Sequence, residues 1–537
     1  MKYDAVVIGA GFSGLYMLQR LREAGFSARV YEAGDGVGGV WYWNRYPGAR
    51  CDSESIYYNY TFSEELLQEW TWSSRYPEQP EILRYLNFVA DKFDLRRDIQ
   101  FETRVTAAHY DEENQQWLIY LEDGSQVSAT YFISGVGCLS AANIPKFKGL
   151  DQFEGKWYHT GHWPQHEKVD FTGKRVGVIG NGSSGVQSIP VIAQEAEHLT
   201  VFQRTPQYTI PARNHPYDPA FIKQTKENYQ QIVEEMRNSW AGFPIKPSSR
   251  SAIEDSQEVR QQVYEEAWEK GGFFLTYTYN DLTMHEESNE TVSEFIRSKI
   301  RETVNKPDVA EKLLPSYYFG TKRPILDTHY YETYNRENVT LIDVNKAPIV
   351  EITPKGLRTT DAEYELDILV FATGYDGMTG PLLKIDIRGK DGLTLKEKWA
   401  EGAHVQTYLG IANAGFPNFF MITGPESPSV LANMPLAIEQ HVDWIGDCLE
   451  HLRDRGVPTI EATLEAETAW SKHCREVADA TLYPKADSWY TGANISGKPR
   501  SFLIYLGGFG VYRHICDDVA AKGYEGFSLA SSPKTVS

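Results

Sequence analysis

Two short glycine patterns limit the fold of this chain more than any other feature of its sequence. The first is GAGFSG at residues 9–14, and the second is GNGSSG at residues 180–185. Each pattern follows a short apolar run that predicts a buried strand, at 5–8 and 175–179, and precedes a helical periodicity. A strand, a glycine-rich turn and a helix in this order are typical of a Rossmann unit. We therefore predict an α/β fold with two Rossmann-like dinucleotide-binding domains.

The first unit has the composition of a complete dinucleotide site. Gly9 permits a tight turn, Gly11 lets the backbone approach a pyrophosphate, and Gly14 lets the helix pack closely on the strand. The N-terminus of the helix attracts phosphate groups. A second strand at 27–31 leads to Glu32, whose carboxylate could accept hydrogen bonds from ribose hydroxyls. Because flavoproteins with two dinucleotides place FAD at the N-terminal unit, we expect FAD here.

The second unit differs from the first after its second strand, at 198–202. Here the chain continues as Gln203-Arg204-Thr205 and contains no acid. A carboxylate would repel the 2′-phosphate of NADPH, whereas an arginine can pair with it. The sequence therefore predicts NADPH rather than NADH, unless Arg204 is an ordinary solvated surface residue. FAD and NADPH are then a natural pair, with hydride passing from one to the other.

The remaining segments predict how these units are connected. Acidic amphipathic segments, such as 226–237 and 292–304, predict a helical insertion. An apolar strand at 367–371 ends in Ala372-Thr373-Gly374 and would return the chain towards the first unit. We expect a FAD-binding domain at 1–140 and 385–537, an NADP-binding domain at 141–214 and 319–384, and a helical insertion at 215–318.

Charge and cysteine content argue against several classes of protein. The formal net charge of −20 disfavours nucleic acids and anionic lipids, and no apolar run reaches the roughly 18 residues of a membrane span. The five cysteines are scattered without a CxxC pair, which argues against a disulfide scaffold, a metal centre and a dithiol flavin reductase. The chain begins directly with a strand, without a signal peptide. We expect a cytoplasmic, metal-free enzyme that acts as a monomer.

Three further segments resemble one family. Residues 153–164 (FEGKWYHTGHWP) match the pattern FxGxxxHxxxWP and are similar to the fingerprint of Baeyer–Villiger monooxygenases. Residues 38–52 resemble the family's second signature, which ends in an active-site aspartate, here Asp52. Residues 320–324 are similar to the segment that carries the family's active-site arginine, here Arg323. The resemblance extends over nearly the whole chain.

The resemblance implies the reaction. NADPH and dioxygen would convert ketones to esters or lactones through a flavin peroxide, with sulfoxidation as a side activity. Negative charge develops on the peroxide and then on the adduct oxygen, where a fixed cation stabilises it. Arg323 is expected to supply this cation, and Asp52 is expected to hold it. Bound NADP⁺ is expected to shield the flavin from water.

The same resemblance assigns the other site residues. Those expected to contact FAD are Gly9, Gly11, Ser13, Gly14, Glu32, Val40, Trp41, Asp52, Tyr58, Val105 and Met434. Those expected to hold NADP are Asn181, Gly182, Ser183, Ser184, Gly185, Val186, Gln187, Arg204, Thr205, Lys322 and Trp489. Arg50 and Asp52 are expected to lie where the two cofactors meet, and Lys322 is expected to pair with the 2′-phosphate.

Substrate choice and two other functions stay open. The loop at 427–434 has the longer of the two lengths found in the family, but Cys138 stands where we expect glutamine in members with this longer loop. The resemblance therefore does not predict the preferred ketone. N- or S-oxygenation of soft nucleophiles would use the same two units and a shortened version of the pattern at 153–164. A redox-sensing flavoprotein that binds a partner is not excluded by any residue.

Overall fold

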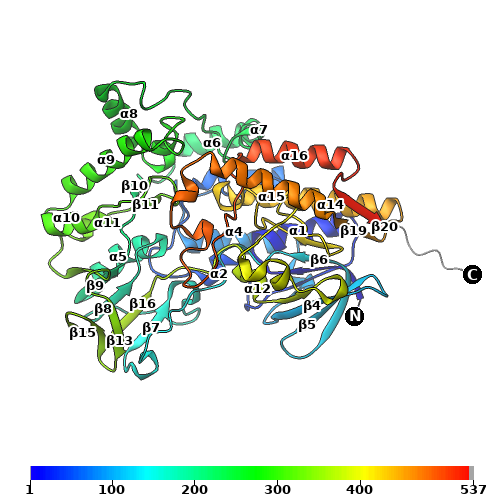
Figure 1. Ribbon diagram of the computed structural model, residues 1–537, viewed down its shortest axis with the longest axis horizontal. Helices are drawn as coiled ribbons and strands as arrows, with labels where there is room; N and C mark the ends of the chain where they lie inside the picture. The colour runs from blue at the N-terminus through cyan, green and yellow to red at the C-terminus, as the bar shows by residue number, and fades with distance from the viewer. Residues whose placement is uncertain (1, 531–537) are drawn as a thin grey trace, which may run out of the picture.

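The structure, a computed structural model, describes residues 2–530 and contains one sheet for each glycine-rich unit. The first sheet has the strand order β17-β4-β5-β6-β1-β2-β3, with β18 paired to β6, and lies at the lower right in Figure 1. Its strands are β1 (Lys2–Ile8), β2 (Ala28–Tyr31), β3 (Ile99–Gln100), β4 (Val105–Asp111), β5 (Gln116–Leu121), β6 (Gln126–Ser134), β17 (Asp386–Arg388) and β18 (Phe419–Met421). β1 is parallel to β2 and β6, whereas β4, β5 and β6 form an antiparallel meander.

The second sheet is entirely parallel, with the order β12-β9-β8-β16-β7, and lies at the lower left in Figure 1. Its strands are β7 (Lys156–His159), β8 (Arg175–Ile179), β9 (His198–Gln203), β12 (Val339–Asp343) and β16 (Ile368–Phe371). The strand predicted at 175–179 coincides with β8. The strand predicted at 367–371 is β16, which lies inside this sheet between β8 and β7. The prediction of an α/β fold with two Rossmann units is therefore confirmed.

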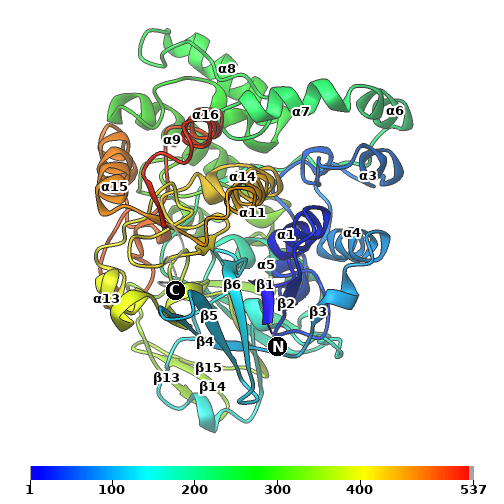
Figure 2. The ribbon, with the colours of Figure 1, turned by 90° about the vertical axis from the view of Figure 1, so that its right-hand side faces the viewer.

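The C-terminal third of the chain returns to the first sheet. β18 pairs with β6, and β17 pairs with β4. The long helix α14 (Met434–Asp454) packs on α1 (Phe12–Glu23), where the Tyr16 hydroxyl donates a 2.5 Å hydrogen bond to Asp443. Helix α16 (Phe509–Ala521) packs on α14 above this sheet, and α15 (Leu464–Asp479) lies on the same side but apart from α14, as Figure 2 shows.

The predicted insertion is helical, but its helix boundaries differ from the expected ones. Its helices are α6 (Pro219–Glu227), α7 (Tyr229–Asn238), α8 (Gln257–Lys270), α9 (Glu286–Thr303) and α10 (Pro307–Leu313). The helix expected at 226–237 is wrong as a single unit, because Asn228, with φ of −113° and ψ of 13°, separates α6 from α7. The helix expected at 292–304 begins earlier, at Glu286, because two acids occupy its first turn and favour the N-terminus of a helix.

Several short strands were not predicted from the sequence. They are β10 (Thr209–Pro211), β11 (Ile325–Asp327), β13 (Ile349–Thr353), β14 (Gly356–Thr359), β15 (Glu363–Glu365), β19 (Thr459–Ala462) and β20 (Phe527–Ala530). The other α-helices are α2 (Val40–Trp43), α3 (Glu64–Glu69), α4 (Gln79–Lys92), α5 (Ser183–Glu195), α11 (Tyr330–Thr333), α12 (Gly380–Leu383) and α13 (Leu395–Lys398). Within residues 2–530, no helix is both long and apolar enough to cross a membrane.

Candidate functional site

The first glycine-rich turn connects β1 to α1 and packs tightly against neighbouring backbone. Gly9 has a φ of +94°, and a Cβ atom there would lie 2.7 Å from the carbonyl oxygen of Gly135. A Cβ atom on Gly14 would lie 1.7 Å from the carbonyl oxygen of Gly9, and one on Gly11 would lie 3.2 Å from the Cα of Gly39. Helix α1 begins without a side-chain cap or an acid in its first turn. This turn therefore forms a close-fitting cradle whose amide groups suit a phosphate.

The acid of this first unit is held by the turn itself. Glu32 is buried, and its Oε2 accepts a 2.8 Å hydrogen bond from the amide of Ala10. Its Oε1 accepts a 2.8 Å hydrogen bond from the amide of Gly34. Burial raises the pKa of Glu32, and the two amide bonds act in the opposite direction. Because each carboxylate oxygen can accept more than one hydrogen bond, Glu32 can still bind ribose hydroxyls.

The second glycine-rich turn connects β8 to α5 and has the same shape with more open space. Gly180 has a φ of +101°, and a Cβ atom there would lie 2.4 Å from the carbonyl oxygen of Ala372. A Cβ atom on Gly185 would lie 2.5 Å from the carbonyl oxygen of Gly180, but one on Gly182 would meet nothing within 4 Å. Helix α5 also begins without a side-chain cap or an acid in its first turn. This turn too suits a phosphate.

The residue equivalent to Glu32 in the second unit is Gln203, which the sequence analysis did not identify as a site residue. The amide of Gly9 donates a 2.8 Å hydrogen bond to the carbonyl of Tyr31, the residue before Glu32. The amide of Gly180 donates a 3.0 Å hydrogen bond to the carbonyl of Phe202, the residue before Gln203. The Oε1 of Gln203 accepts a 2.8 Å hydrogen bond from the side chain of Asn181. Its Nε2 donates a 2.7 Å hydrogen bond to the carbonyl of Lys312. The signal was present in the sequence, because Gln203 follows Gly185 by the same spacing that separates Glu32 from Gly14.

Two cations lie beside this neutral position. Arg204 is exposed, and Lys322 is half-buried with its Nζ 4.4 Å from the centroid of the Tyr317 ring. Burial lowers the pKa of Lys322, the positive charge of Arg204 lowers it further, and the carboxylate of Asp487 raises it. The structure therefore brings Arg204 and Lys322 close enough to repel each other. A dianionic phosphate between them would relieve this repulsion.

The segment before Asp52 connects the two units. The hydroxyl of Tyr46 donates a 2.7 Å hydrogen bond to Oε1 of Gln187, on α5 of the second unit. The Nε2 of Gln187 donates a 3.0 Å hydrogen bond to the carbonyl of Arg50. The guanidinium of Arg50 points elsewhere and forms a 2.7 Å ion pair with Glu78. Arg50 thus lies at the junction of the two units and contacts the second unit through its backbone rather than its side chain.

Arg323 and Asp52 form a forked ion pair across this junction. The Nε of Arg323 donates to one carboxylate oxygen of Asp52 at 2.5 Å, and its Nη2 donates to the other at 3.0 Å. Its Nη1 donates a 2.7 Å hydrogen bond to the carbonyl of Val430, and the guanidinium lies 5.0 Å from the ring centroid of Phe273. Burial lowers the pKa of Arg323, but the charge and hydrogen bonds of Asp52 raise it further, above its usual range. The guanidinium is therefore a permanent cation held in one orientation.

Three buried or half-buried tyrosines surround this cation. They are Tyr277, Tyr483 and Tyr490, and the positive charge of Arg323 acts on the pKa of each hydroxyl. Burial raises all three pKa values above the usual range, so the hydroxyls stay protonated near neutral pH. The sequence analysis missed these residues and Phe273, because single aromatic residues in a chain with 33 tyrosines carry no signal of their own.

The structure shows where the other expected FAD residues lie. The indole nitrogen of Trp41 donates a 3.1 Å hydrogen bond to the hydroxyl of Tyr58. Val105 is buried at the start of β4, Met434 is the first residue of α14, and Val40, the first residue of α2, is 39% exposed. Ser13 is buried near the N-terminus of α1. Trp41 and Tyr58 therefore touch each other directly.

The fingerprint segment at 153–164 has a structural role. The Nδ1 of His159 accepts a 3.0 Å hydrogen bond from the amide of Gly161, and its Nε2 lies 3.2 Å from the hydroxyl of Thr373. A Cβ atom on Gly155 would lie 2.4 Å from the carbonyl oxygen of Asp367. Burial lowers the pKa of His159 to about 4, so the ring is uncharged at neutral pH. The pattern thus fixes the ends of β7 and β16 beside the link between the two units.

Cys138 and Trp489 lie close to the Arg323 region. Cys138 is buried near Ser429, next to Val430, and burial raises the pKa of its thiol to about 11. It therefore stays an uncharged thiol. The ring of Trp489 covers Gly377, where a Cβ atom would lie 2.9 Å from it, and contacts the ring of Tyr490.

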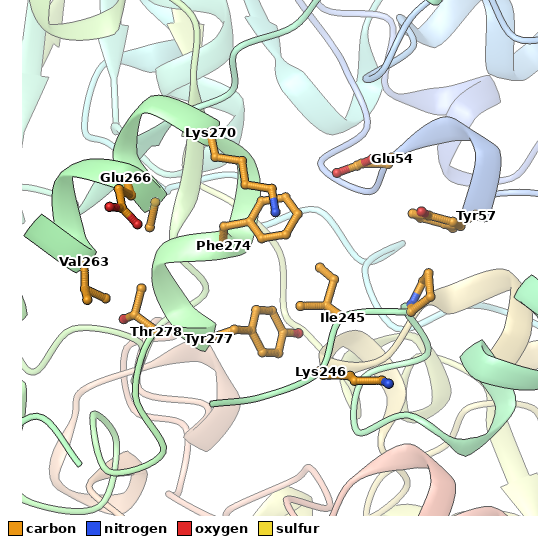
Figure 3. Close-up of a pocket in the computed structure, with 12 residues that line it drawn as sticks. Glu54, Tyr57, Ile245, Lys246, Val263, Glu266, Lys270, Phe274, Tyr277 and Thr278 are labelled. Atoms are coloured by element: carbon orange, nitrogen blue, oxygen red, sulfur yellow. The ribbon is translucent and has the colours of Figure 1, made fainter. Parts of the chain in front are cut away.

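A cavity of about 540 Å³ lies between the insertion and the segment that follows Asp52. Figure 3 shows Phe274 and Tyr277 on one side and Glu54 and Tyr57 on the other. The Nζ of Lys270 lies 3.5 Å from the ring centroid of Phe274. Because Phe274 directly follows Phe273, which contacts Arg323, the cavity shares a wall with the ion pair.

Comparison with known proteins extends this description. The family model "FMO-like: Flavin-binding monooxygenase-like" matches residues 2–241. A Baeyer–Villiger monooxygenase of Pseudooceanicola batsensis is 47% identical over 97% of this chain and 95% of its own length. Phenazine N-monooxygenase PhzNO1 of Lysobacter antibioticus is 44% identical over 99% of this chain and 98% of its own length. The solved structure of an oxidized steroid monooxygenase bound to NADP has a TM-score of 0.95 and 52% sequence identity, covering 99% of this chain and all of that one.

Proposed function

The chain belongs to the Baeyer–Villiger monooxygenases of the flavin-binding monooxygenase-like family, which use FAD and NADPH to convert ketones to esters or lactones, and we propose that Arg323 and Asp52 form its catalytic centre. The observation that carries this proposal is the forked ion pair, in which Asp52 and the Val430 carbonyl fix three nitrogens of the guanidinium. A cation oriented before the reaction stabilises negative charge on the reacting oxygens without reorganising during the step. Asp52 acts here as the group that orients Arg323.

The two cofactors are held by the two glycine-rich turns. FAD and NADPH, when bound, supply hydride transfer and the activation of dioxygen. The turn at 9–14 suits the pyrophosphate of FAD because its glycines allow close approach, and Glu32 offers acceptors for the ribose. Val40, Trp41, Tyr58, Val105 and Met434 would complete the FAD site.

The turn at 180–185 is assigned to NADP. The amide groups at the start of α5 would bind its pyrophosphate, and Arg204 and Lys322 would bind its 2′-phosphate. The absence of an acid at Gln203 supports this assignment, because nothing at that position repels the phosphate. The remaining expected contacts are Ser183, Ser184, Gln187, Thr205 and Trp489.

We place the ketone beside the cavity between the insertion and the segment that follows Asp52. Phe274 and Tyr277 offer an apolar substituent contact there, and Phe274 directly follows Phe273, which contacts Arg323. Charged side chains line the rest of this cavity: Glu54, Lys246, Glu266 and Lys270. Cys138 and the loop at 427–434 would then shape the opposite wall, next to the reacting carbonyl.

Three further points are part of the proposal. The strand pairing supports the division into a FAD-binding domain (1–140 and 385–537), an NADP-binding domain (141–214 and 319–384) and an insertion (215–318). We also propose that the enzyme works as a monomer, since the residues assigned to both cofactors come from one chain. A cytoplasmic location would fit its dependence on NADPH.

The experiment that tests the catalytic assignment replaces Arg323 by alanine. In the Arg323→Ala variant, NADPH should still reduce the bound flavin, while ester formation falls by about 10²–10³-fold because the fixed cation is lost. Flavin absorbance measures the first step, and mass analysis of products from a ketone panel measures the second. Arg455, an exposed arginine on the C-terminal side of α14, offers a matched control as Arg455→Ala. Ester formation at the wild-type rate in Arg323→Ala would overturn the assignment.

Oxygenation of nitrogen is a second candidate activity, favoured by the similarity to phenazine N-monooxygenase PhzNO1. The same assay, run with an aromatic amine and a thioether beside the ketones, distinguishes it. A product from the ketones alone would assign the oxygen transfer to carbonyl substrates.

A further inference from the structure

Glu426 is a buried carboxyl group that the reaction described above does not use. Its side chain is 2% exposed and lies directly before the loop at 427–434. Two donors bind its Oε2, the amide of Thr407 at 2.8 Å and the hydroxyl of Ser471 at 2.7 Å. The Thr407 hydroxyl lies 3.1 Å from the same oxygen, but it shares its one proton with the Pro425 carbonyl, at 2.9 Å. These donors are uncharged.

The backbone of Glu426 is strained and fully engaged. Its φ is +66°, a left-handed conformation that residues with a Cβ adopt at a cost of roughly 1–2 kcal/mol. Its amide donates a 2.8 Å hydrogen bond to the carbonyl of Leu503, and its carbonyl accepts a 3.2 Å hydrogen bond from the indole of Trp470. Glycine would relieve the strain at this position but would remove the carboxylate.

Glu426 therefore stands where four segments meet. Its side chain joins the turn at 407–412 to α15, through Thr407 and Ser471. Its amide joins the segment at 503–505, which in turn bonds to Tyr490 beside Arg323. Four residues after Glu426, the Val430 carbonyl accepts the hydrogen bond from Nη1 of Arg323.

We propose that Glu426 is a positioning residue for Arg323, holding the loop at 427–434 so that the Val430 carbonyl orients the guanidinium. This inference rests on the proposed role of Arg323 in oxygen transfer. If the carboxyl group is lost, its donors lose their common acceptor, and the loop keeps only its other bonds, such as those from the Tyr505 amide to the Ser427 carbonyl at 2.9 Å and from the Asn433 amide to the Ala241 carbonyl at 2.8 Å. Arg323 then samples orientations in which its charge is not aimed at the reacting oxygens. The electrons of NADPH then reduce dioxygen to hydrogen peroxide, and less ester is formed for each NADPH consumed.

The charge on Glu426 changes near neutral pH. Burial raises its pKa to about 7, while the bonds from Ser471 and Thr407 and the charge of Arg475 act in the opposite direction. The other titratable groups nearby are Cys474, whose thiol faces the Glu426 carbonyl, and Tyr505, which packs on Trp470. Because burial raises the pKa of Glu426, the enclosed position of its side chain is most stable while the carboxyl group is protonated, below pH 7, and it weakens as the pH rises through 7.

The test compares ester formed per NADPH consumed between pH 6 and pH 9. In wild type this ratio should be highest below pH 7 and should fall as the pH rises towards 9. Glu426→Gln, which cannot ionise, should show no change with pH. Glu426→Gly, which removes both the strain and the carboxyl group, should be about tenfold lower than wild type at pH 6, since the hydrogen bonds from Thr407 and Ser471 are lost.

Glu439 provides a matched control. It is also 2% exposed, its pKa is also raised to about 7 by burial, and its carboxylate bonds to the amide of Phe62 at 3.0 Å, away from the Arg323 loop. Glu439→Gln should keep the wild-type ratio and its pH profile. Burial raises the pKa of both carboxyl groups, so their ionisation above pH 7 lowers the free energy of unfolding. Glutamine does not ionise, and neither glutamine variant should therefore unfold above pH 7.

The outcomes separate this inference from the proposed function. Equal ratios and profiles in wild type and Glu426→Gln would overturn it, as would an equal loss of pH dependence in Glu439→Gln. If Arg323→Ala makes no ester while Glu426→Gln behaves as wild type, only the positioning role fails. If Arg323→Ala makes ester at the wild-type rate, the proposed role of Arg323 is wrong, and the inference about Glu426 loses its premise.

Discussion

The two Rossmann units of this protein share one turn geometry and differ at one equivalent position. In the first unit that position is Glu32, a buried carboxylate bound to two backbone amides. In the second it is Gln203, an uncharged amide bound to Asn181 and to the carbonyl of Lys312. Under the proposed assignment, the second unit admits a phosphorylated cofactor because it carries no negative charge at this position. Arg204 and Lys322 would then supply the positive charge that binds the phosphate.

The two turns also differ in the space around the middle glycine. Gly11 lies against the backbone of Gly39, at 3.2 Å from where its Cβ would be, whereas Gly182 has open space around it. The first turn is therefore packed against a second glycine-rich segment, whereas no atom of the described residues lies within 4 Å of a Cβ on Gly182. The space at Gly182 suits the approach of a pyrophosphate to the backbone.

The largest effect is expected from adding a methyl group to each turn. Gly14→Ala should prevent FAD binding or folding, because its Cβ would lie 1.7 Å from the carbonyl oxygen of Gly9. Gly182→Ala should bind FAD normally but raise the KM for NADPH by about tenfold or more, because its methyl group would lie where the backbone approaches the pyrophosphate. The flavin content of the purified variants measures the contrast. A Gly14→Ala protein with full flavin content would contradict it.

A large effect is also expected from giving the second unit the acid of the first. Gln203→Glu places a carboxylate beside the 2′-phosphate, and like charges in contact cost several kcal/mol, so the KM for NADPH should rise by about 10²-fold. The KM for NADH, which lacks this phosphate, serves as the internal control and should change little. An equal rise in both constants would show that Gln203 supports the fold rather than cofactor choice.

A smaller effect is expected from removing the exposed cation. Arg204→Ala loses charge-assisted hydrogen bonds in a solvated position, so the KM for NADPH should rise by about tenfold and that for NADH should stay nearly constant. Raising the salt concentration should weaken wild-type NADPH binding and leave the variant less affected. Equal losses for NADPH and NADH would show that Arg204 does not contact the phosphate.

Local patterns in the sequence predicted the units but not their contacts. The strand at 175–179 and the turns at 9–14 and 180–185 were predicted because short-range periodicity and glycine spacing encode them. The pairing of Arg323 with Asp52 followed from family resemblance, and neither its fork geometry nor the Val430 carbonyl could be read from spacing. These contacts join residues separated by more than a hundred positions, so only the packed chain defines them. Gln203 was missed although its spacing equals that of Glu32.

The smallest effect is expected from the half-buried cation, and it depends on pH. Burial lowers the pKa of Lys322, and the charge of Arg204 lowers it further. Phosphate binding favours the charged ammonium, so the affinity for NADPH should be constant near neutral pH and should fall as the pH rises through this lowered pKa. NADH affinity should not follow the same curve.

Lys322→Met tests which of the two cations binds the 2′-phosphate of NADPH at high pH. Methionine keeps an apolar chain against the Tyr317 ring but carries no charge, so NADPH affinity should be lower by a few-fold, about 1 kcal/mol, near neutral pH. The variant's affinity should then show no further loss in the alkaline range, because Arg204 stays charged throughout. If instead the alkaline loss persists in Lys322→Met, a group other than Lys322 causes it, and Lys322 does not bind the phosphate. In that case Gln203 and Arg204 would carry the difference between the two Rossmann units.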